Sequence, residues 1–173
     1  AVLLLKRRPA VETAPFSPLR AFFNLHCRGL PEVTLHKAHE MHPNAQAVLW
    51  HERNMTKTLE LQTGTRASLR VLAQQEVDGI MTRWILLKAG DVPVEFGSIR
   101  VYLRNLPEHD REAVRAGGRP FGTIMLEGGV PQICQPLCYF SVPASDPLIA
   151  AQLFGCQQQD GAERAFCTCD FCN

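Results

Sequence analysis

Apolar and polar residues alternate along two stretches in the middle of the chain, and a continuous apolar run lies between them. Residues 66–77, RASLRVLAQQEV, have an apolar residue at every second position from Ala67 to Ala73, and residues 94–103, VEFGSIRVYL, alternate in the same way. Residues 79–88, GIMTRWILLK, are almost continuously apolar. A period of two is typical of strands with one buried face, and a short apolar run is typical of a strand buried on both faces. Gly-containing turns separate the three stretches, so the pattern predicts an antiparallel meander.

Helix start and stop signals flank this meander on both sides. Residues 17–31 begin with a candidate N-cap, Ser17, followed by a proline at the first helical position, and they end with glycine and proline. Residues 140–155 predict a short helix capped by Ser145 or Asp146. Two more helices are predicted within residues 42–54 and 106–120, and a final hairpin strand within residues 157–173.

Strands and helices that come in blocks, rather than in strict alternation, indicate an α+β fold. The expected architecture is a single antiparallel β-sheet of about six strands with helices packed on one face. Residues 1–18 are rich in proline and are expected to be an irregular segment. Residues 19–173 are expected to form one domain, because 173 residues are enough to bury a hydrophobic core.

Charge and hydropathy exclude several classes of function. The formal net charge is +1 and no basic stripe is present, so no nucleic-acid partner is expected. No apolar run approaches the length of a membrane-spanning helix. The opening AVLLLKRRP places its basic residues after a short apolar run, which is the reverse of a signal peptide. The protein is therefore expected to be cytoplasmic, with a small molecule as its partner.

Cysteine and histidine clusters raise the question of a metal site. The seven cysteines include the C-terminal stretch CTCDFC, and His36, His39 and His42 follow one another at intervals of three. Zinc held by the C-terminal cysteines and by Cys134 and Cys138 is one interpretation, and free, mostly buried thiols are the other. The histidine spacing lacks the HExxH pattern and indicates a solvated face. We expect no metal.

Arg83 stands at the head of the apolar run and is the strongest candidate functional residue. Arginine stays charged when it is buried, so it needs a carboxylate partner. That partner is either an acid of the protein, such as Glu76, Asp78 or Glu95, or an anion from outside. The alternative is that Arg83 occupies an outward-facing strand position and is solvated. The chain has no phosphate-binding loop and no GxSxG elbow. Chemistry without a cofactor, or plain ligand binding, is therefore favoured.

Three blocks of sequence together resemble the chorismate pyruvate-lyase family, in its broader branch. They are RNMTKTLE, TRWILLKAGDVPVEFGSI and GGRPFGTIM, which occur in the family's order and at similar separations, and LPEHDREAV before the last block is also similar. The resemblance covers residues 19–130 and implies that Met55 and Thr56 open a strand. It also implies one antiparallel sheet and a lyase that removes pyruvate from chorismate to give 4-hydroxybenzoate, without metal or cofactor. Such an enzyme serves ubiquinone or aromatic secondary-metabolite biosynthesis.

The same resemblance implies roles for individual residues. Arg83 would anchor a substrate carboxylate, while the backbone amides at Met55 and Phe121, next to Gly122, would bind the ligand. The family has a catalytic glutamate on its last strand, and this strand is expected to be truncated or divergent here. Asp170 is the candidate replacement; if Cys169 matches that position instead, the acid is absent.

A non-catalytic domain of the same fold that binds a small aromatic carboxylate is the alternative function. Effector domains of some bacterial transcription regulators are of this kind. This chain has no helix-turn-helix or basic region, so it would lack the DNA-binding half of such a regulator. A native acidic partner for Arg83 would favour a third, purely structural interpretation.

Overall fold

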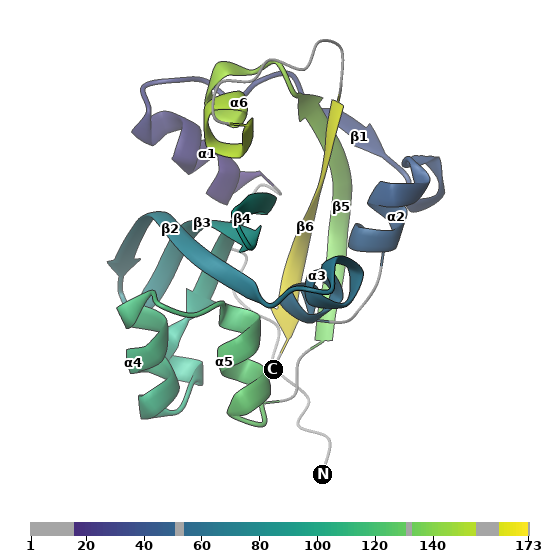
Figure 1. The fold of residues 1–173 in the computed structure, drawn as a ribbon. Coiled ribbons are helices and arrows are strands. Elements are labelled where there is room, and N and C mark those ends of the chain that lie inside the picture. Colours follow the sequence, from purple (N-terminus) through teal and green to yellow (C-terminus); the bar gives the residue numbers. More distant parts are fainter. Residues whose placement is uncertain (1–15, 51–53, 131–132, 155–162, 173) are drawn as a thin grey trace.

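Two antiparallel sheets with helices against them make up the part of the chain that the computed structural model describes, residues 16–50, 54–130, 133–154 and 163–172 (Figure 1). Side chains are described for residues 16–50, 54–130 and 138–152. The strands are β1 (Thr34–His36), β2 (Ala67–Val77), β3 (Ile80–Ala89), β4 (Val92–Tyr102), β5 (Ile133–Pro143) and β6 (Glu163–Cys172). The helices are α1 (Ser17–Leu25), α2 (Pro43–Leu49), α3 (Met55–Thr63), α4 (Glu108–Ala116), α5 (Phe121–Glu127) and α6 (Pro147–Phe154), with 3-10 turns at Ala38–Glu40 and Leu103–Asn105.

The predicted meander is confirmed as the sheet β2–β3–β4. Val77 pairs with Ile80 across a two-residue turn, in which Asp78 and Gly79 have φ angles of 51° and 73°. Positive φ at both central positions is the geometry of a tight hairpin turn, and an Asp-Gly pair favours it. Gly90, at φ 61°, turns the chain between β3 and β4. Local turn chemistry therefore sets the register next to each turn, and the register shifts once in each hairpin, between Val71 and Ala73 and between Leu87 and Lys88.

The prediction of one six-stranded sheet is wrong, because the described strands form two sheets of three. The second sheet has the order β1–β5–β6. Strand β5, which the sequence did not predict, contains Pro136 and ends at Pro143. Proline disrupts a ladder of hydrogen bonds, and here the register shifts between Pro136 and Cys138. A strand interrupted in this way does not show the regular alternation by which the meander was recognised.

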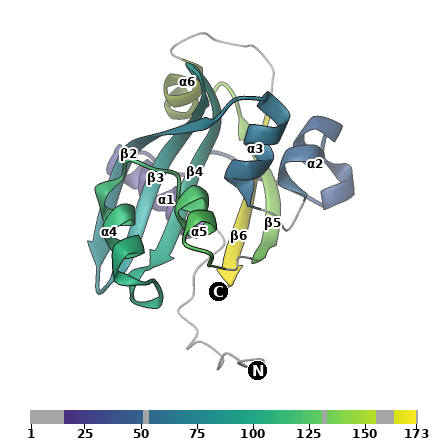
Figure 2. The same ribbon diagram turned by 60° about the horizontal axis from the view of Figure 1, so that its bottom comes forward.

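Helices lie on both faces of the meander, so the prediction of helices on one face is also wrong (Figure 2). Trp84 and Leu86 of β3 point into a cluster that also contains residues of α1, α6 and β5. Met81, on the opposite face of β3, packs with Val114 of α4 and residues of α5. Strand β3 is buried on both sides, which explains its continuous apolar sequence.

Met55 and Thr56 begin helix α3, and the strand implied by the family resemblance is absent at this place. The side chain of Asn54 accepts a hydrogen bond from the backbone N–H of Lys57 at 3.1 Å, as an N-cap does. Gly64 ends the helix in the left-handed conformation at φ 64°. Helical capping at both ends therefore decides the conformation of this segment.

The two predicted N-caps at the ends of the chain have different outcomes. Asp146 caps α6, since its Oδ1 accepts hydrogen bonds from the N–H groups of Leu148 at 2.9 Å and Ile149 at 3.2 Å. The prediction of Ser17 as a cap is wrong. Helix α1 begins at Ser17 itself, with Phe16 at the cap position. The Ser17 hydroxyl instead accepts a hydrogen bond from Arg100, at 3.0 Å.

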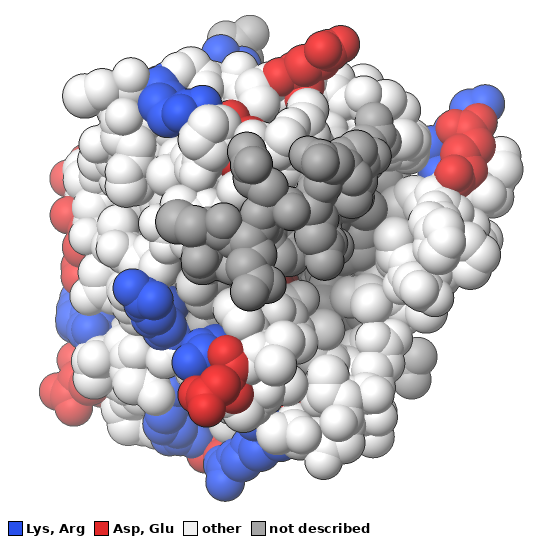
Figure 3. All heavy atoms as spheres, turned by 45° about the horizontal axis from the view of Figure 1, so that its top comes forward, with Lys and Arg blue, Asp and Glu red and all other residues white. Residues whose placement is uncertain are grey.

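Charged side chains do not gather into one large patch on the face that Figure 3 shows. Lys and Arg side chains lie among Asp and Glu side chains around its edge, with neutral residues between them. Among the described helices, none has both the length and the hydropathy needed to cross a bilayer.

Candidate functional site

Arg83 is fully buried in strand β3, with 1% of its surface exposed. None of its three guanidinium nitrogens has a hydrogen-bond partner in the described part of the chain. Glu76, one of the acids that could have paired with it, is instead held by Arg115 through two hydrogen bonds of 2.9 and 3.0 Å. Burial lowers the pKa of Arg83, because desolvation disfavours the charged form. Within the part of the chain whose side chains are described, Arg83 is therefore a desolvated positive charge without a carboxylate on it.

A carboxylate lies on the same face of the sheet as Arg83 but does not pair with it. Arg83 is opposite Ile99 on β4, and Glu95 is four residues before Ile99, so alternation places all three on one face. Between them lies Gly97, and a Cβ atom built there would be 3.5 Å from Oε1 of Glu95. The missing side chain at Gly97 makes room for the side chain of Ile85, whose Cγ1 would lie 3.0 Å from such a Cβ atom, and for the carboxylate of Glu95.

Glu95 has an unusual protonation equilibrium. Its Oε2 atom is buried without a hydrogen-bond partner in the described residues. Burial raises the pKa of Glu95 to about 7, because the charged form has lost its hydration. At neutral pH this carboxyl group therefore exists in both protonation states, as a group that exchanges protons with a ligand must.

A pocket of about 50 Å³, here called the inner pocket, lies between this face of the sheet and the beginnings of two helices. Its wall brings together three residues implied by the family resemblance, Met55, Phe121 and Gly122. Arg83 is not itself among the lining residues, but its partner in the register, Ile99, is. The other lining residues are Asn54, Thr56, Ile85, Leu87, Glu95 and Pro120.

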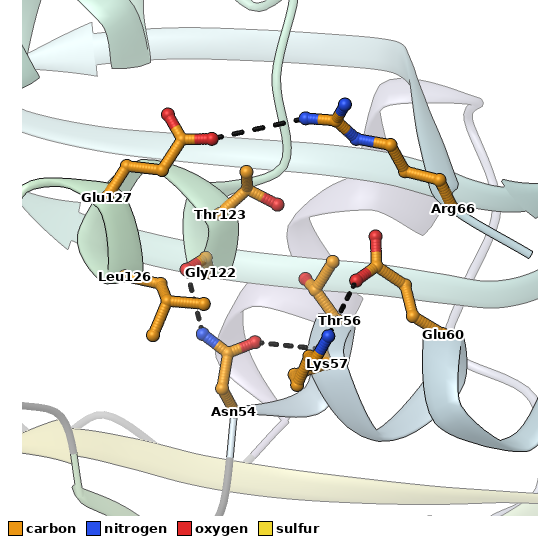
Figure 4. Close-up of a pocket in the computed structure, with 9 residues that line it drawn as sticks. All are labelled: Asn54, Thr56, Lys57, Glu60, Arg66, Gly122, Thr123, Leu126 and Glu127. Carbon is orange, nitrogen blue, oxygen red and sulfur yellow. Dashed lines mark hydrogen bonds and ion pairs between the residues drawn. The ribbon is translucent and has the colours of Figure 1, made fainter.

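Asn54 joins the beginnings of helices α3 and α5 (Figure 4). Its Oδ1 caps α3, while its Nδ2 donates a hydrogen bond of 2.8 Å to the carbonyl oxygen of Gly122. The contact is so close that a Cβ atom at Gly122 would lie 2.4 Å from Oδ1 of Asn54. Only glycine fits at position 122 with Asn54 in this place, so the two residues form one structural unit.

A second pocket, of about 240 Å³, shares Asn54, Thr56 and Gly122 with the inner pocket and is here called the outer pocket (Figure 4). Its charged side chains pair with one another. Lys57 and Glu60 are 3.9 Å apart, and Arg66 is 4.0 Å from Glu127. The outer pocket is larger but its charged side chains are paired, whereas Arg83, which has no partner among the described side chains, lies on the same sheet face as Ile85 and Ile99 of the inner pocket.

Asp170, the predicted proton-handling residue, is placed only by its backbone. Strand β6 pairs it with Gln135 of β5, and its side chain lies outside the described residues. The same holds for the side chains of the C-terminal cysteines. Whether Asp170 replaces the family's glutamate stays a prediction.

The three histidines that follow one another at intervals of three have separate roles. His36 Nε2 is 2.8 Å from the hydroxyl of Ser141 on the neighbouring strand, and His42 caps α2 by accepting from the N–H of Asn44 at 3.3 Å. His39 lies 3.9 Å from Glu40. Within the described residues, no three His, Cys, Asp or Glu side chains come together in a way that could hold a metal ion.

Two residues of the inner pocket, Glu95 and Asn54, were not predicted as site residues. Glu95 was considered only as an ion-pair partner for Arg83. Its place in the site follows from the register of the β3–β4 hairpin, which shifts by one residue between Leu87 and Lys88. A count from the turn at Gly90 without that shift would place Glu95 on the opposite face from Arg83. Asn54 directly before Met55 is an N-cap signal, and it was overlooked because the segment was taken for a strand.

Substitution of Glu95 by Gln is expected to change how stability depends on pH. The pKa of Glu95 is higher in the folded protein than its ordinary value of 4.5, so the folded state binds this proton more tightly. Wild-type stability therefore falls as pH rises from about 4.5 to about 7, and the loss is complete above that range. The difference in the free energy of unfolding, Glu95→Gln minus wild type, should therefore increase by roughly 2 kcal/mol from pH 5 to pH 8. Urea unfolding at both pH values measures the difference.

Glu76→Gln is the matched control for this measurement. The hydrogen bonds from Arg115 lower the pKa of Glu76, so its contribution changes only below the ordinary pKa of a glutamate. The difference in the free energy of unfolding between Glu76→Gln and wild type should stay constant between pH 5 and pH 8. Equal pH dependence in wild type and Glu95→Gln would show that Glu95 is ionised and hydrated in the folded protein.

Comparison of the chain with protein-family models, with curated proteins and with solved structures gave no match. The residues and geometry of the inner pocket are therefore the basis for proposing a function.

Proposed function

We propose that the protein is a chorismate pyruvate-lyase, which removes pyruvate from chorismate and releases 4-hydroxybenzoate. The observation that carries this proposal is the buried guanidinium of Arg83, which has no hydrogen-bond partner among the described residues. An unpaired charge in a protein core is destabilising by several kcal/mol, on the order of the loss when one partner of a buried ion pair is removed. A ligand carboxylate that forms two parallel hydrogen bonds with Arg83 would neutralise the charge.

The walls of the inner pocket suit an anionic ring. The beginnings of α3, at Met55, and α5, at Phe121, both line it. Backbone N–H groups at a helix start carry partial positive charge, and they favour negative groups nearby. Ile85, Leu87 and Ile99 supply apolar surface on the sheet side. Chorismate combines an apolar ring with two carboxylates, which is the chemistry that these walls would recognise.

Ligand binding requires the walls to move. The inner pocket measures about 50 Å³, whereas pockets for drug-sized ligands begin at roughly 300 Å³. The junction of Asn54 and Gly122 separates the inner pocket from the larger outer pocket, because both residues line each of them. Separation of α3 from α5 at this junction would join the two spaces, and closure behind the ligand would exclude water.

The proposed reaction requires few catalytic groups from the protein beyond such closure. Loss of pyruvate makes the ring aromatic, so the driving force lies in the substrate. The protein has to hold one conformer, exclude water and assist one proton transfer. Arg83 fixes the position of the ring carboxylate, and the low dielectric of a closed pocket strengthens that contact.

Incubation of the purified protein with chorismate tests the proposal. We expect the ultraviolet absorbance of 4-hydroxybenzoate to appear together with an equal amount of pyruvate, measured with lactate dehydrogenase and NADH. Addition of a chelator should leave the rate unchanged. If the protein produces neither product above the uncatalysed rate, it is not a chorismate lyase.

A non-catalytic binding domain for aromatic carboxylates is the second candidate. The same buried guanidinium favours it, because binding a carboxylate requires no further group in the site. Isothermal titration with 4-hydroxybenzoate distinguishes the two functions. Tight binding without turnover of chorismate would identify a binder, and turnover would identify the lyase.

A further inference from the structure

Glu95 is the one acid that lines the inner pocket, among the residues that the structure describes. It stands on β4, whereas the catalytic acid implied by the family resemblance stands on the last strand. Its Oε2 atom is buried and makes no hydrogen bond with a described residue, although the carboxyl group could accept several. A buried, unsatisfied carboxyl group in the wall of a pocket needs an explanation, because leaving it without partners is unfavourable.

The position of Glu95 relative to Arg83 supplies that explanation. Arg83 is opposite Ile99, and Glu95 leans back over Gly97, which is one pleat of the strand away from Ile99. Two residues of a strand span roughly 7 Å. That is close to the distance between a ring carboxylate and a substituent on the opposite ring carbon. Once Ile85, which lies over Gly97, moves aside with the walls of the pocket, a ring whose carboxylate is held by Arg83 would present its far end to Glu95.

We propose that Glu95 contacts the end of the bound ring that lies away from Arg83 and carries the proton that moves in the reaction. This inference rests on the proposed lyase function. The carboxylate of Glu95 takes the proton from the ring carbon that bears the hydroxyl group. The electron pair of that C–H bond forms the new ring double bond, and the adjacent C–O bond breaks. Enolpyruvate leaves with that oxygen and receives the proton on its methylene carbon, which gives pyruvate and returns Glu95 to its ionised form.

The groups around Glu95 are consistent with a base that works near neutral pH. Arg83 and Glu76 lie on the same face of the sheet as Glu95, and Glu76 is paired with Arg115. From α3, Lys57 and Glu60 face the outer pocket and pair with each other at 3.9 Å. The first turn of α5 has no acidic residue. Burial raises the pKa of Glu95 to about 7, so the ionised base and its protonated form are both accessible.

Steady-state kinetics of Glu95→Gln with chorismate test the inference, with Glu95→Asp as a second variant and Glu76→Gln as the matched control. Glutamine keeps the size of the side chain but cannot accept the proton. We expect kcat of Glu95→Gln to fall at least ~100-fold, with the affinity for benzoate within threefold of wild type. The wild-type rate should rise through about pH 7, and Glu95→Gln should lack that rise. If Glu95→Gln has the same kcat and the same pH dependence as wild type, the inference is wrong.

Failure of the proposed lyase function would be visible separately. If wild type binds hydroxybenzoate but does not turn over chorismate, the lyase function is wrong. The relative affinities for benzoate and 4-hydroxybenzoate then test whether Glu95 contacts the far end of the ring. Loss of the preference for 4-hydroxybenzoate in Glu95→Gln would support contact between Glu95 and the far end of the ring. An unchanged preference, or no binding of either ligand by folded wild type, would overturn it. Circular dichroism establishes that each variant is folded.

Discussion

Replacement of Arg83 by Met is expected to stabilise the protein and at the same time to abolish ligand binding. Methionine has a similar volume and no charge, so the substitution removes a buried guanidinium that has no partner among the described residues. Apolar replacement of buried ionic groups is often stabilising, by roughly 1–4 kcal/mol. Each kcal/mol corresponds to a rise in Tm of roughly 2–4 °C for a domain of this size. Thermal unfolding measures the first effect, and titration with 4-hydroxybenzoate measures the second.

Arg115→Met is the matched control for this pair of measurements. Arg115 is an exposed arginine that pairs with Glu76 at 2.9 Å, and such surface pairs contribute little, so its loss should leave the Tm close to that of wild type. Ligand affinity should not change in the control. If Arg83→Met unfolds more easily than wild type, Arg83 stabilises the fold through a partner of its own, and the proposed site is wrong. Arg83→Ala should also abolish binding while the fold survives.

Substitution of Gly122 by Ala is expected to destabilise the junction of α3 and α5 and to weaken ligand binding more than tenfold. The added Cβ would lie 2.4 Å from Oδ1 and 2.6 Å from Nδ2 of Asn54, so Asn54 or the start of α5 has to move. Overpacking of this kind destabilises by roughly 1–3 kcal/mol. Asn54 would also lose its hydrogen bond to the carbonyl of Gly122. Urea unfolding and ligand titration measure the two effects.

Gly118→Ala is the control for this substitution, because a Cβ at Gly118 has no heavy atom within 4 Å. Gly118→Ala should change the free energy of unfolding by no more than about 0.5 kcal/mol, as most surface substitutions do. A double-mutant cycle with Asn54→Ala tests the cause. In the Asn54→Ala background the clash partner is absent, so Gly122→Ala should be less destabilising by at least about 1 kcal/mol. Additive effects of the two substitutions would show that Asn54 is not what excludes a side chain at position 122.

Within the fold, the elements that the sequence predicted are those specified by local signals. The Asp78–Gly79 turn and the alternation in β2 predicted the meander, and the turn has the expected positive φ angles. Asp146 and Pro147 predicted the beginning of α6. Local conformational preferences act within a few residues, so they can be recognised without knowledge of distant contacts.

Two features of the fold could not be predicted in this way. Strand β5 carries two prolines, and it is held by pairing with β1 and β6, which are far from it in sequence. The helices that cover the two faces of β3 come from separate parts of the chain, α1 and α6 on one face and α4 and α5 on the other. A continuous apolar run predicts a strand that is buried on both sides, but it does not say which elements bury it.

By itself, the sequence determined that Arg83 stands within an apolar run that forms a strand, and it left open whether this arginine is buried or faces solvent. Only the tertiary structure decided that this charge is buried and has no partner in the described residues. Glu76 is held by Arg115, and Glu95 is four residues along β4 from the position opposite Arg83. The tertiary structure also decided that Met55, Phe121 and Glu95 line one pocket. The physical reason is that pairing and burial depend on which distant segments meet. The meeting of α3 and α5 at Asn54 and Gly122 results from a hydrogen bond and a close contact between residues 68 positions apart.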